Sequence, residues 1–528
     1  MSANILIGVG GTGAKLVEAS IHAAVAGLTT SELAIGFVDQ DNSNGNVKRA
    51  EQLLANVHDA RALWRDHGRA HDLGQESSLF RANIHPLAPK ENLWVPHAQS
   101  STTLASIFGR ESMTADDRHV FDLLFAAGTG AGDTEQDLAL DEGYRGRPHI
   151  GSAAMTARIE GDVEFWRQLM EAIKRGQAGS EVRLMLAGSV FGGTGAAGFP
   201  TLTRLIRRRL REGQARNVKI GGLLMLPYFG FAAPAEEQGS IANVARAEEL
   251  IMQARGALKY YDVLFRQERV FDELYLVGWD RMFELGYHSP GAKDQANPPL
   301  APELVGAMAV SRFFEPSHKV AEESANPVFV SARADGDKLQ WSDLPSPTDS
   351  QPDAPHDALG GMLRFAVAWK HWAPVVTARR NALSKLVGSD PWYKAQGVSQ
   401  VDFQRQPPEQ EVAALSQYTD ALLTWASAIQ GYADRARLGF SLWRTNDFTA
   451  FNPANPQNPV TLNLPAGDEA RYGAAFNNIL PQRDAGDAPP TAAALLMRLN
   501  AETLPDTTQK GLGRFVAALR AFSEPVAP

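Results

Sequence analysis

Cysteine is absent from this 528-residue sequence. Without thiols the chain forms no disulfide, uses no thiolate nucleophile and builds no cysteine-ligated metal site. Apolar runs long enough to span a membrane are also missing, since a spanning helix needs about 20 such residues. Residues 1–9 lead into an apolar strand without the basic segment and cleavage site of a signal peptide. These absences favour a cytoplasmic protein without a membrane span.

An excess of positive charge is missing too. The chain has 51 Lys and Arg against 60 Asp and Glu, a formal net charge of −9. A general nucleic-acid binder needs a basic face to offset phosphate charge, so we expect no nucleic-acid partner. The apolar content of 44% is ordinary for a globular protein. At this length one core is not enough, so two or more domains are expected.

Glycine is plentiful at two places, each of which follows an apolar strand-like run and precedes a helical pattern. The two loops lie about 180 residues apart and contain Gly10-Gly11-Thr12-Gly13 and Gly192-Gly193-Thr194-Gly195-Ala196. A glycine-rich loop has few Cβ atoms to keep phosphate oxygens away, and its N–H groups meet the positive end of a helix dipole. Two such loops in one chain predict a single polyphosphate held from two sides.

The first loop belongs to a strand–helix–strand pattern over residues 3–9, 14–26 and 33–38. Gly8 to Gly13 satisfy the dinucleotide fingerprint G-x-G-x-x-G, and Asp39 follows the second strand where a ribose-binding acid would lie. An NAD-dependent Rossmann enzyme is therefore an alternative. The Walker pattern does not fit, because Lys15 comes one residue late and no Ser or Thr follows it.

Strands and helices alternate up to about residue 315, which predicts a doubly wound parallel sheet. Pro200 is expected near the first turn of a helix over 201–211. The chain then changes character, because helical patterns dominate at 358–385, 409–435, 490–502 and 510–522. We therefore expect an α/β domain over 1–320, a linker-like segment over 321–357 and a mainly helical C-terminal region over 358–528.

The second loop resembles the signature of the tubulin and FtsZ superfamily, Gly-Gly-Gly-Thr-Gly-Thr/Ser-Gly. Gly192 to Gly195 match its middle, whereas Phe191 replaces the first glycine. The wider run over 188–200 resembles the divergent bacterial tubulin-like proteins more closely than FtsZ. Across residues 3–315 the order of elements is also similar, with a third loop at 143–148. The resemblance implies a tubulin/FtsZ-like nucleotide-binding domain over 1–320.

The resemblance further implies GTP or GDP as ligand, with Mg²⁺ bound to the nucleotide. Backbone N–H groups and threonine hydroxyls of the two loops would hold the phosphates, while two arginines would offset the γ-phosphate charge. Glu236 or Glu237 and a following Asn would contact the ribose. The edge of the base would be bound by Asn297 and Glu303 or by backbone groups. The implied nucleotide-binding residues are Gly10, Gly11, Thr12, Gly13, Asp39, Arg145, Arg147, Gly192, Gly193, Thr194, Gly195, Ala196, Glu237, Asn243 and Asn297.

For function the resemblance implies nucleotide-dependent self-assembly into filaments or oligomers. The chain has no close counterpart of the acidic loop that completes hydrolysis between subunits, although Glu322 and Glu323 follow the relevant helix. We therefore expect a weak GTPase at most. The alternative within the family is a nucleotide-gated scaffold that binds a protein partner through the C-terminal helical region.

Two further clusters have ordinary explanations. Trp369, Trp372 and Trp392 recur around one helix, and aromatic residues at helical spacing are usually core. His67 and His71 have a spacing that would suit a metal ion, but the intervening Gly68 weakens a helix, so two solvated histidines are expected. We predict no metal site in the protein other than a nucleotide-bound Mg²⁺.

Overall fold

Most of both halves of the chain is described by the computed structural model. The described residues are 3–29, 32–61, 79–80, 82–99, 101–126, 134–144, 146–158, 163–177, 180–213, 217–231, 247–279, 282–285, 297–320, 328–331, 338–348, 350–351, 353–381, 391–405, 409–444, 468–480, 490–504 and 510–524.

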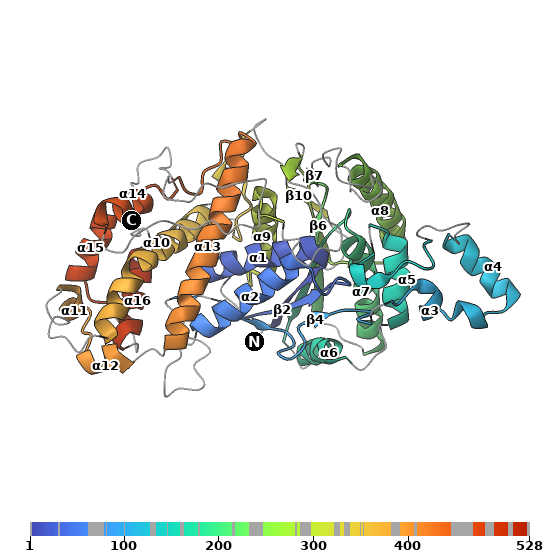
Figure 1. Ribbon diagram of the computed structural model, residues 1–528, viewed down its shortest axis with the longest axis horizontal. Helices are drawn as coiled ribbons and strands as arrows, with labels where there is room; N and C mark the ends of the chain where they lie inside the picture. The colour runs from blue at the N-terminus through green and yellow to red at the C-terminus, as the bar shows by residue number, and fades with distance from the viewer. Residues whose placement is uncertain are drawn as a thin grey trace.

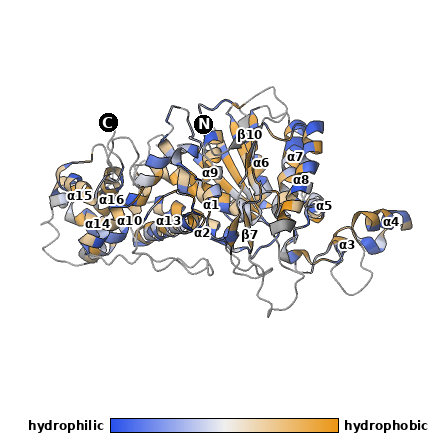
Figure 2. Cartoon of the chain, turned by 90° about the horizontal axis from the view of Figure 1, so that it is seen from above, coloured by the Kyte–Doolittle hydropathy of each residue, from blue (hydrophilic) through white to orange (hydrophobic). Residues whose placement is uncertain are grey.

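A parallel sheet forms the centre of the molecule (Figures 1 and 2). Its strand order is β10-β8-β6-β5-β1-β2-β3, and β4 also pairs with β2. The strands are β1 (Ala3–Val9), β2 (Glu32–Val38), β3 (Asn83–Pro86), β4 (Leu93–Trp94), β5 (Val182–Ser189), β6 (Val218–Met225), β8 (Glu273–Val277) and β10 (Val328–Ser331). A second sheet pairs β7 (Phe229–Phe231) with β9 (Phe283–Leu285). The predicted doubly wound α/β fold is confirmed.

The central strands are buried along nearly their whole length. All eight residues of β5 are buried, and so are the last six of β1. Continuous apolar runs of this kind suit parallel strands that are covered on both faces. In Figure 2 these strands form the orange interior between the helices.

Two neighbouring glycines of β6 show which helices cover which face. A Cβ on Gly221 would lie 2.9 Å from the ring of Phe313, and one on Gly222 would lie 2.8 Å from the ring of Phe199. Because successive residues of a strand face opposite sides, α9 (Ala301–Phe314) and α7 (Gly193–Glu212) cover opposite faces. Helix α1 (Gly10–Ala26) packs against both α9 and α2 (Gly45–Ala60), whereas α5 (Pro148–Arg158) packs against α7.

The remaining helices surround this sandwich. They are α3 (Leu104–Ile107), α4 (Ala115–Leu124), α6 (Glu164–Gln177), α8 (Ala247–Gln267), α10 (Ala354–Asn381), α11 (Pro391–Ala395), α12 (Gln400–Arg405), α13 (Glu409–Arg435), α14 (Glu469–Asn477), α15 (Ala492–Ala501) and α16 (Gly511–Phe522). Short 3₁₀ turns cover Arg110–Ser112, Leu140–Glu142 and Trp341–Asp343. None of the described helices is long and apolar enough to cross a bilayer.

One prediction about α7 was wrong. The glycine loop is itself the first turn of the helix, so Pro200 lies inside α7 rather than near its start. Proline lacks an N–H, which leaves the carbonyl four residues earlier without its usual helical donor. That carbonyl, of Ala196, accepts a hydrogen bond of 2.6 Å from the Tyr261 hydroxyl instead. A residue of α8 therefore compensates for a proline that local propensity places at a helix start.

The C-terminal helices pack directly on the α/β region. Helix α10 contacts α1, and α13 lies along α2 (Figure 1). The imidazole of His22, on α1, is fully buried against the rings of Trp425 (4.8 Å between centroids) and Tyr418 (5.9 Å). Both halves of the chain share one core. The boundary at residue 320 stays a prediction.

The predicted tryptophan core is confirmed for two residues. Trp369 is 1% exposed and donates to the Ser416 hydroxyl, and Trp392 is 2% exposed with its ring 4.4 Å from that of Phe515. Trp372 is partly buried and packs against the same core. These indoles therefore hold the C-terminal helices together.

Candidate functional site

The two glycine loops meet where the connections of the sheet change direction. Strands β1 and β5 are neighbours. From β1 the chain passes through α1 to β2 on one side, and from β5 it passes through α7 to β6 on the other. In open α/β sheets the crevice outside the carboxyl ends of two such strands is the usual ligand site.

Glycine is required in both loops because their backbones touch. A Cβ on Gly10 would lie 3.0 Å from the amide nitrogen of Gly195, and Gly10 has a φ of +74°. A Cβ on Gly13 would lie 2.5 Å from the carbonyl oxygen of Ala187, at the end of β5. Side chains at these positions would force the two loops apart. The first and second loops therefore form one continuous surface.

The surface consists of two helix N-termini without side-chain caps. Neither Val9, before α1, nor Gly192, before α7, makes a side-chain capping hydrogen bond, and no acidic residue lies in either first turn. In α7 the amide of Ala196 donates to the carbonyl of Gly192 (2.9 Å). The amides before it, including those of Gly193 and Thr194, have no acceptor within the helix. Two dipole ends with unused donors converge at this point.

Asp39 lies buried at the end of β2 beside the second loop. One of its oxygens accepts from the Thr194 hydroxyl (2.9 Å), and the other accepts from the Asn44 side chain (3.1 Å). Burial raises the pKa of Asp39 from 3.8 to about 7, although the bond from Thr194 lowers it and Asp41 raises it further. A carboxyl group that loses its charge near neutral pH is compatible with an anion close by.

A third loop covers the second one. A Cβ on Gly193 would lie 2.9 Å from the amide nitrogen of Gly146 and 3.1 Å from the Cβ of Tyr144. The Tyr144 hydroxyl donates to the side chain of Gln40, in the loop after β2 (3.2 Å). Next to it, Arg147 has a buried Nη1 atom that finds no hydrogen-bond partner among the described residues. Burial alone would raise the pKa of Glu135, but a hydrogen bond from the Ala126 amide and the charge of this guanidinium help to lower it below its usual value.

The start of α2 forms the remaining wall, which the sequence did not reveal. A Cβ on Gly11 would lie 2.8 Å from the side-chain nitrogen of Asn44 and 3.2 Å from that of Asn46. The side-chain oxygen of Asn46 accepts from the amide of Asn297 (2.8 Å), and Arg49 donates to the Asn297 carbonyl (3.0 Å). Asn297 is thus joined to the first loop through α2. The polar run after β2 was the only sequence signal for this wall.

Lys15 lies away from the crevice, in agreement with the rejection of a Walker loop. It is 1% exposed, forms an ion pair with Glu303 and has the rings of Tyr228 and Phe229 within 5.5 Å. Burial lowers the pKa of Lys15. Glu303 also accepts from the Tyr228 hydroxyl (2.6 Å) and the Leu300 amide (2.9 Å). Glu303 therefore belongs to the core, and the base-reading role expected for it was wrong.

Several expected residues lie outside the described ranges. These are Arg145, Glu236, Glu237, Asn243, Glu322, Glu323, His67 and His71. Within those ranges, the structure holds no group of three or more His, Cys, Asp or Glu side chains that could bind a metal ion. The structure therefore brings together Gly10 to Gly13, Asp39, Gly192 to Ala196 and, through α2, Asn297. Arg147 directly follows the third-loop residue that Gly193 touches, Gly146.

Known proteins resemble this chain in sequence over one segment and in structure over a wider one. The family model described as "Tubulin like" matches residues 133–330, which include the second loop. No curated protein matches the sequence. Solved structures with similarity include CetZ2 from Haloferax volcanii in a GTPγS-bound protofilament, at 16% identity, 59% of this chain, 58% of that chain and a TM-score of 0.25.

Two further structures are of TubZ. One is a GTPγS-form protofilament from Bacillus thuringiensis serovar israelensis, at 13% identity, 58% of this chain, 55% of that chain and a TM-score of 0.23. The other is a helical model of the TubZ-Bt two-stranded filament, at 11% identity. It covers 62% of this chain and 57% of that chain, with a TM-score of 0.24. The chain covers between 55% and 58% of the length of these three proteins. The segment over residues 133–330, which contains the second loop and strands β5, β6 and β8, is thus similar in sequence to tubulin-like proteins.

Proposed function

We propose that this protein binds a guanine nucleotide, with its phosphates against the N-termini of α1 and α7, and that binding drives assembly of the chain into oligomers or filaments. The observation that carries the proposal is the contact between the two glycine loops, where Gly10 faces the amide of Gly195. Two uncapped helix ends at one point favour a ligand with several negative charges. Asp39 borders this point through its hydrogen bond from Thr194, and Arg147 would contribute its positive charge from the third loop.

Guanine is proposed because of the family. Mg²⁺ would arrive with the nucleotide, since it prefers phosphate and carboxylate oxygens and keeps several waters. The Cβ of Asp41 lies 3.8 Å from a Cβ placed on Gly143, at the start of the third loop. The Asp41 carboxylate would be an oxygen ligand on that side. The expected ribose contacts of Glu237 and Asn243 and the γ-phosphate contact of Arg145 remain part of the proposal.

A thermal-shift panel with GTP, GDP, ATP and NAD tests the ligand class. GTP and GDP should raise the melting temperature, because a ligand that binds only the folded state stabilises it. A larger shift with ATP would replace guanine by adenine in the proposal. A shift with NAD alone would favour the Rossmann enzyme instead.

Gly192→Asp tests the position of the phosphates. Gly192 has the extended backbone of an N-cap residue, and a carboxylate there would accept from the first amides of α7. We expect an intact fold and a loss of nucleotide affinity of about 100-fold, since like charges placed together cost several kcal/mol. Gly192→Ala is the matched control, because its Cβ would only meet the Ser189 hydroxyl at 3.3 Å. Equal affinity of both variants would refute the site.

Light scattering separates filament formation from a scaffold role. With GTP we expect scattering and phosphate release that both rise steeply with protein concentration, because hydrolysis would be completed at contacts between copies. Nucleotide binding without either signal would leave the binding site standing and favour the nucleotide-gated scaffold. The Gly192→Asp variant should show no increase in scattering on addition of GTP and no phosphate release.

A further inference from the structure

An arm projects from the α/β region beyond α5. We use this name for residues 104–126, which comprise α3, the 3₁₀ turn Arg110–Ser112 and α4. Helix α3 contacts α5, and α4 lies at the far end of the arm in Figures 1 and 2. The arm follows β4 in the chain and precedes the third loop of the nucleotide site.

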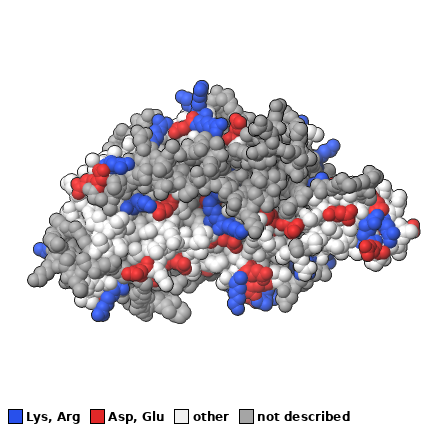
Figure 3. Space-filling view, viewed as in Figure 1, with Lys and Arg blue, Asp and Glu red and all other residues white. Residues whose placement is uncertain are grey.

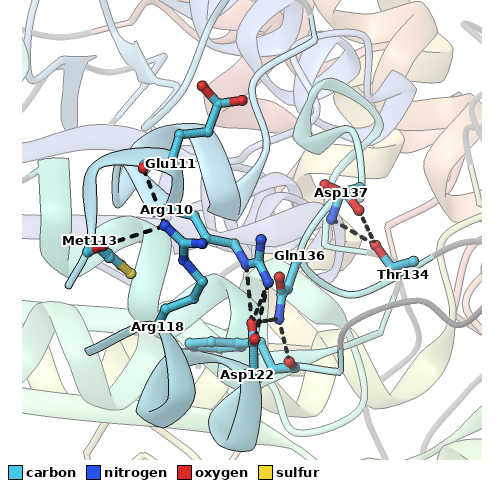
Figure 4. A network of polar contacts seen from close by, with 9 residues as sticks. Arg110, Glu111, Met113, Arg118, Asp122, Thr134, Gln136 and Asp137 are labelled. Carbon is cyan, nitrogen blue, oxygen red and sulfur yellow. Dashed lines mark hydrogen bonds and ion pairs between the residues drawn. The ribbon is translucent and has the colours of Figure 1, made fainter. Parts of the chain in front are cut away.

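The arm holds its shape through its own contacts (Figure 4). Arg110 binds the Asp122 carboxylate through two nitrogens (2.9 and 3.0 Å), and the Gln136 side chain donates to the same carboxylate (2.8 Å). This pairing lowers the pKa of Asp122. The Phe121 ring packs against those of Phe108 (5.8 Å) and Phe125 (5.1 Å). A planar, two-nitrogen ion pair gives the turn a defined geometry.

The outer side of α4 is apolar and uncovered. Leu123, Leu124 and Val120 are 74%, 64% and 53% exposed. Glu111, Asp116 and Asp117 are exposed on the arm, and Arg110 and Arg118 are partly exposed beside them. Because Arg110 is paired with Asp122, acidic groups remain in excess around the patch and form an acidic border. Figure 3 shows the arm at the right-hand edge, where acidic and basic side chains lie beside uncharged surface. Clustered apolar side chains with a charged border are typical of a protein contact.

Helix α8 presents a second uncovered apolar face, with the opposite charge. Met252 and Val263 are 72% and 52% exposed, and Tyr260 is 51% exposed. Arg255 and Lys259 lie on the same exposed side, at spacings of three and four residues from Met252 and Val263. The exposed Asp262, next to Val263, is paired with Arg266 (2.9 Å), so Arg255 and Lys259 leave this face with an excess of positive charge. The two faces of one chain thus match in apolar character and are complementary in net charge. The exposed leucines show that α8 of the same copy does not cover α4.

We propose that α4 of one copy docks on α8 of a second copy. The leucines of the arm would cover Met252 and Val263, and the acidic border would face Arg255 and Lys259. Such a contact joins two different surfaces, so each copy keeps one of each for a further neighbour and the assembly extends. It involves no residue of the nucleotide crevice and is therefore expected without nucleotide.

Charge-reversal variants of the full chain test this contact in nucleotide-free buffer by sedimentation velocity. Wild-type protein should associate as its concentration rises. Asp116→Lys with Asp117→Lys should weaken association by about tenfold, and so should Arg255→Glu with Lys259→Glu, since each brings like charges together. Combining all four changes should restore association. Wild-type protein that stays monomeric, or a failure of the combined variant to recover, would overturn the proposal.

A mixture of an arm variant with an α8 variant identifies the two contact surfaces, because a misfolded variant could not associate in the mixture. Leu123→Ser with Leu124→Ser removes the arm contact, and Met252→Ser with Val263→Ser removes the α8 contact. Each variant alone should be monomeric, whereas their mixture should form dimers and stop there, because only one intact pair of surfaces remains. Met497→Ser, at an exposed site on α15, is the control and should associate like wild type. A mixture that stays monomeric would refute the assignment, whatever nucleotide binding shows.

Discussion

The two ends of α1 lie in contrasting surroundings. Its first turn is made of small residues that touch the backbone of the second loop, and its amides have no side-chain cap. Near its other end His22 is enclosed by Trp425 and Tyr418 from α13. The first end leaves donors unused, whereas the second fills its space with large rings. The same helix thus serves a ligand site at one end and the stability of the whole chain at the other.

Each of these two surroundings also contains a buried titratable group with a shifted pKa. The two shifts have opposite effects on how the stability of the chain depends on pH. Burial raises the pKa of Asp39 to about 7 and lowers that of His22 from 6.5 to about 3. Both shifts keep the group neutral. Between about pH 4 and 6.5 the folded chain holds a proton on Asp39 that the unfolded chain has lost, and it lacks a proton on His22 that the unfolded chain has gained. The two contributions to the pH dependence of unfolding therefore oppose each other.

The largest effect is expected where the rings meet α1. Trp425→Ala removes a 1% exposed indole from the junction with His22. We expect the free energy of unfolding to fall by about 3–5 kcal/mol, since large-to-small changes in a core leave a cavity. Denaturant unfolding at pH 7 measures it. A loss as small as that of an exposed residue would mean that the junction contributes little to the stability of the chain.

The variant His22→Phe tests whether the buried end of α1 makes stability depend on pH. Since the folded-state pKa of His22 is lowered, its stabilising contribution is present above pH 6.5 and is lost as pH falls. Phenylalanine takes up no proton. The advantage of the variant over wild type should therefore be about 2 kcal/mol larger at about pH 4.5 than at about pH 6. A constant difference across this range would contradict a neutral, buried His22.

Asp39→Asn should show the opposite trend. Since the folded-state pKa of Asp39 is raised, stability is lost as pH rises from its ordinary value of 3.8 to about 7. The neutral amide escapes this loss, although it places a donor toward Asn44. The difference between variant and wild type should favour the variant by about 2 kcal/mol more at about pH 6 than at about pH 4.5. Chemical unfolding at both values, with His22→Phe in parallel, tests the sign.

The last comparison is between a glycine that the loop contact requires and a glycine that no contact requires. Gly10→Ala should destabilise the fold by about 1–3 kcal/mol, because φ is +74° and the new Cβ would press on Gly195. Gly473→Ala, on α14, meets nothing within 4 Å and should stabilise the fold by about 0.5–1 kcal/mol. Melting temperatures report both. Equal responses would remove the argument that close approach dictates glycine in the loop.

Regular elements were largely predictable, and irregular ones were not. Helix α13 begins and ends at the predicted residues 409 and 435, and β1 at 3 and 9, because long apolar periodicity signals the element itself. Helix α5, the strands β3 and β4 and the pair β7–β9 went unpredicted, since runs this short or this mixed have no clear period. The start of α7 was misplaced because a tertiary bond from Tyr261 offsets the proline.

The candidate site likewise has residues that the sequence could predict and residues that only the structure revealed. The glycines were recognisable because each loop lies between an apolar run and a helix, which is local information. The wall formed by Asn44, Asn46 and Arg49 was not, because its role arises only when α2 meets the loop and Asn297. The buried pair of Lys15 and Glu303 is likewise a contact between distant segments.

The sequence by itself determined that the chain makes parallel strand–helix units, two of them with glycine turns suited to phosphate, and that thiol chemistry is excluded. Only the tertiary structure decided that β1 and β5 are neighbours, and hence that loops about 180 residues apart share one surface. It also decided that the leucines of α4 remain uncovered. The reason is that local patterns encode period and turn chemistry, whereas strand order and burial depend on which distant segments pack together.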